Sequence, residues 1–190
     1  MKTIVSLSLL TTFLAFVGCG KSEPLAEASE ARPDRTTSTS VASASVEDTS
    51  SLPQLGAAPA WTLSRVDGST LTSAELAGKV VVIDFWATWC PPCREEIPGY
   101  IAMQRELESA GLVIVGVSLD QGGPGVVNKF NETFKMNYPL VMGDEKMVDA
   151  FGGIEAIPTT FLIDRNGQIR HRKVGMMDRS EYEPLVKSLL

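Results

Sequence analysis

The chain has 190 residues, of which 44% are hydrophobic and 21% charged, which is typical of one globular domain with extensions. Its formal net charge of -6 argues against a nucleic-acid partner, because such partners select a basic surface. With three cysteines and one histidine, a four-ligand zinc site would need all of them, including Cys19 at the far end of the chain. We therefore expect no metal site and no cofactor.

Residues 1–19 have the pattern of an export signal. Lys2 supplies a positive charge, and residues 4–17 are mostly apolar and too few for a confident transmembrane helix. The end of this segment, Phe16-Val17-Gly18-Cys19, resembles the cleavage site of bacterial lipoproteins, in which the cysteine becomes the lipid-bearing N-terminus. Phe16 departs from the usual leucine, so a plain signal peptide with an incidental Cys19, or an uncleaved anchor, remain alternatives. All three interpretations place the rest of the chain outside the cytoplasm, where disulfides are common.

Residues 20–54 are predicted to form a disordered tether. The segment is rich in Ser, Thr and Ala and contains no aromatic residue, so it has too little apolar surface to offset the entropy of ordering. As a flexible coil it would have an r.m.s. reach on the order of 30–35 Å. A low-complexity tail without function is the alternative. The folded domain is then expected over residues 55–190, long enough for a good core.

The first half of this domain contains a hairpin and a βαβ unit. Asp67-Gly68 is a turn signal between the apolar positions of 61–63 and Leu71. Residues 80–85 form a near-continuous apolar run, typical of a strand buried on both faces. A helix follows from the cysteines at 90 and 93 to Gly111, and residues 112–119 form another buried strand. A strand, a helix and a strand in this order predict parallel pairing.

The second half is predicted to add a helix and a strand, then a short helix, a hairpin and a last helix. The expected ranges are 125–136 (helix), 138–142 (strand), 145–151 (helix), 159–163 (strand), 169–174 (strand) and a final helix from Asp178 or Ser180. Asn166-Gly167 is a strong two-residue hairpin turn. A glutamate three residues after Asp178 or Ser180 predicts a capping box. The whole pattern indicates a three-layer α/β sandwich with a mixed sheet and helices on both faces.

The segment Trp89-Cys90-Pro91-Pro92-Cys93 carries the chemistry. A thiol at a helix N-terminus is favoured as the thiolate by the helix dipole and by free backbone N–H groups. Cys90 precedes the helix and is the predicted nucleophile with an accessible sulfur, whereas Cys93 is expected to be the buried resolving thiol. A purely structural disulfide is disfavoured, because a bond that closes a loop of only two residues restricts little of the unfolded chain and so adds little stability. We expect transfer of electrons between dithiols and disulfides.

Three segments together resemble a known family: 85–98 (FWATWCPPCREEIP), Gly78-Lys79 and 157–164 (IPTTFLID). They are similar to the thioredoxin-like thiol-disulfide oxidoreductases of the bacterial cell envelope, above all the membrane-tethered reductases of cytochrome c maturation and spore formation. Residues 121–154 match the extra helix and strand that distinguish this group from plain thioredoxin. The resemblance covers most of residues 55–190 and implies a thioredoxin-like sandwich with that insertion and an N-terminal hairpin.

The resemblance also nominates residues around the cysteines. Pro158 matches the cis-proline that lies opposite the active-site disulfide; an ordinary loop proline is the alternative. Trp89 is expected to cover the disulfide and contact the partner, and Trp86 to lie in the core. Proline at both positions between the cysteines removes N–H donors, and no histidine is present there, which favours a reductant over an oxidant.

Two carboxylates are candidate proton acceptors. Asp84 lies in the apolar strand six residues before Cys90, where thioredoxin has an acid that helps deprotonate the buried cysteine; many relatives in the envelope group lack it. A structural role beside a polar neighbour such as a lysine is the alternative. Glu96 lies three residues after Cys93, on the same helix face, at an offset where some envelope reductases have a glutamate. A surface acid in the first turn of the helix is the alternative.

The predicted function is therefore a lipid-anchored, extracytoplasmic enzyme of the bacterial cell envelope that reduces specific protein disulfides. Apocytochrome c is the leading substrate by analogy. We expect a membrane electron donor of the thiol-transfer type and a monomeric protein. A thiol peroxidase would require a Pro-x-x-x-Thr/Ser arrangement before Cys90, which is absent. A redox-inert binding module is the third hypothesis, and the presence of both cysteines argues against it.

Overall fold

The computed structural model describes residues 52–190. The predicted export signal, the predicted lipid site at Cys19 and the tether up to residue 51 lie outside these residues. Within residues 52–190, no helix is both long enough and apolar enough to cross a membrane.

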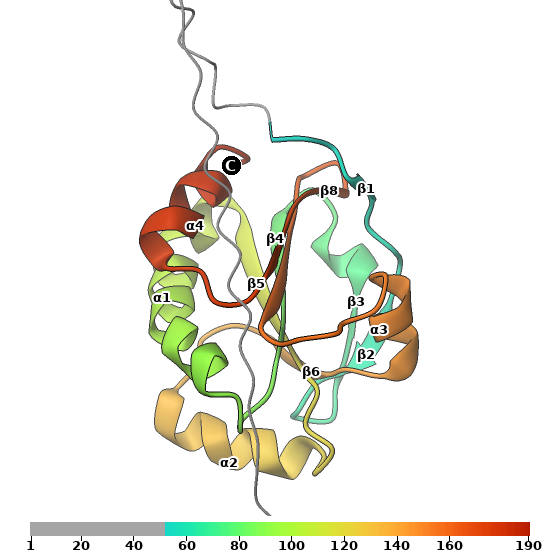
Figure 1. The fold of residues 1–190 in the computed structure, drawn as a ribbon, viewed down its shortest axis with the longest axis vertical. Helices are drawn as coiled ribbons and strands as arrows, with labels where there is room; N and C mark the ends of the chain where they lie inside the picture. Colours follow the sequence, from blue (N-terminus) through green and yellow to red (C-terminus); the bar gives the residue numbers. More distant parts are fainter. Residues whose placement is uncertain (1–51) are drawn as a thin grey trace, which may run out of the picture. The chain divides into compact units, whose positions relative to one another are not determined.

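A six-stranded mixed sheet forms the centre of the domain (Figure 1). Its strands run in the order β1-β8-β7-β4-β5-β6, and β4, β5 and β6 are parallel, as predicted for the βαβ unit. Strand β7 is antiparallel to both β4 and β8, and β1 is antiparallel to β8. The strands are β1 (Gly56–Ala57), β4 (Val80–Trp86), β5 (Leu112–Ser118), β6 (Leu140–Met142), β7 (Thr159–Ile163) and β8 (Gln168–Val174).

Helices cover both faces of the sheet, as expected for a three-layer sandwich. Helices α1 and α4 lie on one face, and α3 lies on the other together with the hairpin β2–β3 (Figure 1). The remaining elements are β2 (Thr62–Ser64), β3 (Thr70–Thr72), η1 (Ser73–Leu76), α1 (Pro91–Leu107), η2 (Glu108–Ala110), α2 (Pro124–Phe134), α3 (Glu145–Ala150) and α4 (Arg179–Lys187). The predicted hairpin is confirmed, with Thr62 paired to Thr72 across the turn.

Strand β4 divides its side chains between two cores, because successive residues of a strand point to opposite faces. Val80 and Val82 pack in the core beneath α1 and α4, whereas Val81 and Ile83 pack in the core that includes the hairpin and α3. The same alternation assigns Asp84 to the α1 face. All seven residues of β4 are buried. The packing of this strand therefore holds its carboxyl end in place, and with it the start of the segment that leads to the cysteines.

One expectation for the last helix is wrong. Asp178 is the N-cap of α4, but its side chain makes no capping hydrogen bond, and the backbone N–H of Glu181, which a capping box would use, donates to the Asp178 carbonyl oxygen instead. The predicted capping box therefore does not form there.

Candidate active site

The two cysteines lie at the start of α1, just after the short connection from β4. Cys90 is the N-cap of α1 and is joined to Cys93 by a disulfide, with their Cα atoms 5.4 Å apart. The backbone N–H of Cys93 donates to the Cys90 Sγ over 3.3 Å. Because Pro91 and Pro92 occupy the first two helical positions and have no N–H, Cys93 supplies the first helical N–H available to this sulfur.

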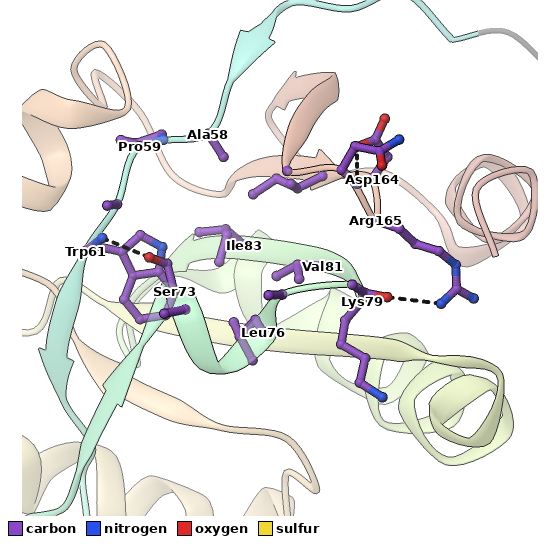
Figure 2. A pocket seen from close by; sticks show the side chains of 17 residues that line it. Ala58, Pro59, Trp61, Ser73, Leu76, Lys79, Val81, Ile83, Asp164 and Arg165 are labelled. Carbon is purple, nitrogen blue, oxygen red and sulfur yellow. Dashed lines mark hydrogen bonds between the residues drawn. The ribbon is translucent and has the colours of Figure 1, made fainter.

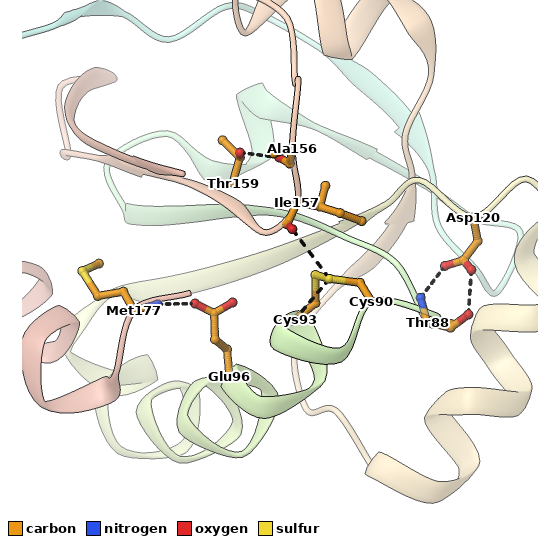
Figure 3. Close-up of a disulfide and its surroundings, with 9 residues drawn as sticks. All are labelled: Thr88, Cys90, Cys93, Glu96, Asp120, Ala156, Ile157, Thr159 and Met177. Atoms are coloured by element: carbon orange, nitrogen blue, oxygen red, sulfur yellow. Dashed lines mark hydrogen bonds between the residues drawn. A yellow bond between two sulfur atoms is a disulfide. The ribbon is translucent and has the colours of Figure 1, made fainter. Parts of the chain in front are cut away.

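Cys90 is less accessible than expected, with 3% of its surface exposed. The loop that carries Pro158 approaches it closely: the Cys90 Sγ lies 3.8 Å from the carbonyl oxygen of Ile157 (Figure 3). The Ile157–Pro158 peptide bond is cis, as the resemblance implied. The Pro158 carbonyl in turn accepts a 2.8 Å hydrogen bond from the backbone N–H of Gly175, which ties this loop to the segment after β8.

Asp84 lies on the α1 face of β4 with only 2% of its surface exposed. Its Cα partner on β7 is Thr160. Burial raises the pKa of Asp84 well above its usual value, the charge of Glu96 raises it further, and a hydrogen bond with Thr160 opposes both effects. Its Oδ1 atom has no hydrogen-bond partner in the described part of the chain. Asp84 is therefore a buried acid that holds its proton more tightly than an exposed carboxyl group does.

Glu96 is also buried, with 7% of its surface exposed, whereas its neighbour Glu95 is exposed. Its Oε1 atom accepts a 2.8 Å hydrogen bond from the backbone N–H of Met177 (Figure 3). Burial raises the pKa of Glu96 to about 7; the hydrogen bond from Met177 works against this increase and the nearby charge of Asp178 adds to it. This environment does not fit a surface acid in the first helical turn.

Tyrosines surround the two carboxyl groups on this face of the sheet, a feature that the sequence analysis did not anticipate. The Tyr100 hydroxyl lies 3.3 Å from the Thr160 Oγ1, within hydrogen-bond distance. The rings of Tyr138 and Tyr182 each make an edge-to-face contact with that of Tyr100. Burial raises the pKa of all three phenols well above the usual value, and the charges of Asp84 and Glu96 raise it further.

The two tryptophans beside the motif lie in different environments. Trp89 is 67% exposed next to Cys90, whereas Trp86 is fully buried in the core, as predicted. The exposed indole is available to a partner that approaches the disulfide.

Sequence reasoning missed a polar cluster directly before the cysteines. Asp120 accepts hydrogen bonds from the backbone N–H and the hydroxyl of Thr88, at 2.9 and 2.6 Å (Figure 3). It also accepts a hydrogen bond from the Ser118 hydroxyl at 2.8 Å. The carboxyl ends of parallel strands meet at one edge of a sheet, and Asp120 follows β5 as Thr88 follows β4. The predicted parallel pairing of these two strands could therefore have indicated that Thr88 and Asp120 lie close together.

A separate hollow of about 330 Å³ lies away from the cysteines (Figure 2). Its lining includes Trp61, Leu76, Lys79 and Val81, which places it at the beginning of β4. The cysteines follow the end of this seven-residue strand, about 20 Å away at roughly 3.3 Å per residue. The hollow is therefore not part of the disulfide site. Within residues 52–190 there is also no group of three or more His, Cys, Asp or Glu side chains placed to hold a metal ion.

Comparisons with known proteins agree with this geometry. Residues 56–172 match the AhpC/TSA family. Over 134 residues the chain is 33% identical to the thiol-disulfide oxidoreductase ResA of Bacillus subtilis, covering 68% of this chain and 74% of the relative. It is 32% identical over 127 residues to the thioredoxin-like protein YneN of the same organism, covering 66% of this chain and 74% of that protein.

A solved structure shows the same fold. The thiol:disulfide interchange protein of the thioredoxin family from Chlorobium tepidum TLS superimposes with a TM-score of 0.66 at 35% identity, covering 70% of this chain and 95% of that one. A close cysteine pair at the N-terminus of α1, in a fold shared with such proteins, has the arrangement that exchange of thiols and disulfides requires. The chain therefore belongs to the thioredoxin-like AhpC/TSA family and is a thiol-disulfide oxidoreductase of the ResA type.

Proposed function

We propose that the protein is a membrane-tethered, extracytoplasmic reductase of specific protein disulfides that works through Cys90 and Cys93. The observation that carries this proposal is the position of Cys90 as the N-cap of α1, with its sulfur 3.3 Å from the Cys93 N–H. A thiolate at this place is stabilised by the helix dipole and by that N–H group.

The reaction has two exchange steps. The Cys90 thiolate attacks one sulfur of the substrate disulfide, the substrate S–S bond breaks, and one substrate cysteine leaves as a thiolate. Cys93, deprotonated, then attacks the Cys90 sulfur and expels the second substrate cysteine. The substrate gains two electrons and two protons, and the enzyme is left with the Cys90–Cys93 disulfide seen in the structure. A membrane donor of the thiol-transfer type would return two electrons to it.

Asp84 and Glu96 are the proposed proton acceptors for the second step. Cys93 must lose its proton before it can attack, and its thiol is buried, so bulk water is a poor base for it. Both carboxyl groups are buried nearby with raised pKa values, which makes each a stronger base than an exposed acid once it is ionised. Trp89 is proposed to contact the substrate, and Pro158 to present the opposite side of the site.

The proposed direction, towards reduction, rests on Pro91 and Pro92. They leave the Cys90 sulfur with few N–H donors and without a histidine, so the thiolate is stabilised less than in a strong oxidant. A dithiol that is stabilised less gives up its electrons more readily. Apocytochrome c is the proposed substrate by analogy with the related reductases.

The proposed location rests on the sequence of residues 1–54. An apolar segment that ends at Cys19, followed by a Ser/Thr/Ala-rich tether, supports export and lipid attachment at Cys19. Labelling cells with a radioactive fatty acid tests this proposal. Wild-type protein should be labelled and the Cys19→Ala variant should not; label on both would contradict it.

Trapping tests the reaction in the full-length protein. The Cys93→Ala variant should accumulate a mixed disulfide between Cys90 and its substrate, because the resolving thiol is missing. The Cys90→Ala variant is the matched control and should trap nothing. Wild-type protein should reduce insulin disulfides with a dithiol donor. Absence of insulin reduction together with absence of a trapped partner would defeat the proposal and favour a redox-inert module.

The competing enzyme function is a thiol peroxidase. Residues 80–89, which precede Cys90, contain no proline, so the arrangement expected before a peroxidatic cysteine is missing. Consumption of hydrogen peroxide with a dithiol donor separates the two functions. Peroxide consumption faster than insulin reduction would favour the peroxidase.

A further inference from the structure

A buried carboxylate holds the turn that presents Cys90. We call Asp120, Thr88 and Ser118 the Asp120 cluster. Thr88 lies two residues before Cys90, and both its backbone N–H and its hydroxyl donate to Asp120, at 2.9 and 2.6 Å. Ser118 donates its hydroxyl to the same carboxylate and accepts from the Asp120 backbone N–H at 3.1 Å. Asp120 is 7% exposed and Ser118 is fully buried, so water competes little for these bonds.

The hydrogen bonds of the Asp120 cluster join two strand ends that are 32 residues apart in sequence. The backbone N–H of Leu119 also donates to the Trp86 carbonyl at 2.9 Å, and the Cys90 N–H donates to the Ala87 carbonyl at 3.1 Å. Leu119 therefore holds the beginning of the segment from Trp86 to Cys90, the bond between Ala87 and Cys90 closes the segment into a turn, and the Asp120 cluster holds its middle. Asp120 accepts two hydrogen bonds from Thr88, whereas Leu119 donates one to Trp86.

Placement of this turn matters because the Cys90 sulfur has few donors. Pro91 and Pro92 have no N–H, so the Cys93 N–H is the first helical donor that it can meet. A shift of the turn by a few tenths of an ångström would lengthen this 3.3 Å contact, and no neighbouring N–H group could replace it. Trp89, which lies between Thr88 and Cys90, would move with the turn.

We propose that Asp120 is a positioning residue, which holds Thr88 so that the Cys90 sulfur meets the Cys93 N–H and the Trp89 side chain faces the substrate. The inference rests on the proposed function in one respect, that Cys90 is the attacking thiol. Asp120 acts through Thr88 and takes no part in the exchange itself.

Titration of Cys90 tests the inference in the reduced full-length protein. The rate of alkylation of Cys90 by iodoacetamide is followed against pH by the mass of the peptide that contains it. The Asp120→Ala variant should raise the pKa of Cys90 by roughly one unit, because the thiolate loses a well-placed N–H donor. Its insulin reduction at pH 7 should slow by up to about tenfold.

Conservative variants separate position from charge. In the Asp120→Asn variant the amide oxygen can accept the Thr88 N–H and the amide nitrogen can donate to the Thr88 hydroxyl, so the Cys90 titration should stay close to that of the wild type. If Asp120 acted through its charge, Asn and Ala would both lower the pKa of Cys90, and that outcome would overturn the inference. Thr88→Val loses the hydroxyl bond only and should give a smaller increase than Asp120→Ala.

Asp164 offers a matched control. It is also 7% exposed and accepts hydrogen bonds from the backbone N–H groups of Asn166 and Gln168 and from Arg170, but it follows β7 at the opposite end of the sheet. Asp164→Ala should lower stability without moving the Cys90 titration. The inference would be overturned if Asp164→Ala raised the pKa of Cys90 as much as Asp120→Ala does. It would also be overturned if neither Asp120→Ala nor Thr88→Val changed that pKa. Loss of insulin reduction by the wild type would instead defeat the proposed function.

Discussion

The Glu96 carboxylate and the Met177 backbone N–H are joined by a 2.8 Å hydrogen bond across 81 residues of sequence. Met177 lies in the connection between β8 and α4, and Gly175 in the same connection donates to the carbonyl of Pro158. One short segment thus contacts both a titrating carboxyl group and the loop opposite the disulfide. The ionisation state of Glu96 is therefore expected to influence both the stability of the domain and the surroundings of the cysteines.

We predict that Glu96 makes the domain less stable as pH rises from 4.5 to about 7. Folding raises its pKa from 4.5 to about 7, so in this interval the folded protein binds more protons at this site than the unfolded chain does. The free energy of unfolding therefore falls across the interval, by about 2 kcal/mol after allowance for partial screening by solvent. Urea unfolding of the wild type and the Glu96→Gln variant at several pH values measures the difference between them.

The matched control for this measurement is Glu95→Gln, since Glu95 is adjacent but exposed. Glu95→Gln should keep the pH dependence of the wild type. In Glu96→Gln, the fall in the free energy of unfolding between pH 4.5 and about 7 should be absent. If the two variants behaved alike, the assignment of this titration to Glu96 would be wrong.

Asp84→Asn should slow the second exchange step. Asparagine has nearly the same shape and cannot take a proton from Cys93, so release of the second substrate thiol should slow by about 10- to 100-fold. The first step, attack by Cys90, should change less. Rapid-quench measurement of the mixed disulfide separates the two steps. Equal rates of release in the variant and the wild type would remove Asp84 from the proton transfer.

Pro92→His should make the protein more oxidising. A histidine beside the Cys90 sulfur adds a donor and a positive charge, both of which stabilise the thiolate. For each tenfold stabilisation of the reduced form, the reduction potential should rise by about 30 mV. Equilibration with glutathione measures this potential. Pro92→Ala restores an N–H without adding charge and should give a smaller rise; a histidine variant with an unchanged potential would contradict the argument.

Trp89→Ala should weaken the use of protein substrates but not of small disulfides. The indole is exposed, so its removal should leave the fold intact while it removes apolar contact area beside Cys90. We expect KM for an insulin substrate to rise by about tenfold, with little change for a small aromatic disulfide. Leu55→Ala, an exposed apolar residue near β1, is the control and should affect neither substrate. A parallel loss on both substrates would indicate a role for Trp89 in the chemistry instead.

Most of the fold could be predicted from local pattern. Strand β7 has the predicted bounds, and β4 and β5 differ from prediction by one residue, because long apolar runs between turn signals define strands well. Strand β1 was missed because two residues carry no periodicity. It exists through pairing of Gly56 with Ile169 on β8, more than a hundred residues away. The error at Asp178 has a similar origin, since a capping motif depends on where the preceding loop places the side chain.

The cysteine pair was predictable because its members are three residues apart at the start of one helix. Asp84 and Glu96 could be nominated by their offsets from Cys90 and Cys93, but their burial could not. Met177, the partner of Glu96, is distant in sequence and left no signal. Asp120, the partner of Thr88, is indicated only by its position after β5, the parallel neighbour of β4.

The sequence by itself determined the kind of chemistry: two thiols, a helix N-terminus and two prolines that withhold N–H donors, all within a few consecutive residues. Only the tertiary structure decided how the site is tuned. The pKa of Glu96 near 7 arises from burial between α1 and the segment before α4, and the position of Cys90 depends on a carboxylate from the end of β5. The physical reason is that desolvation and hydrogen-bond geometry depend on which segments pack together.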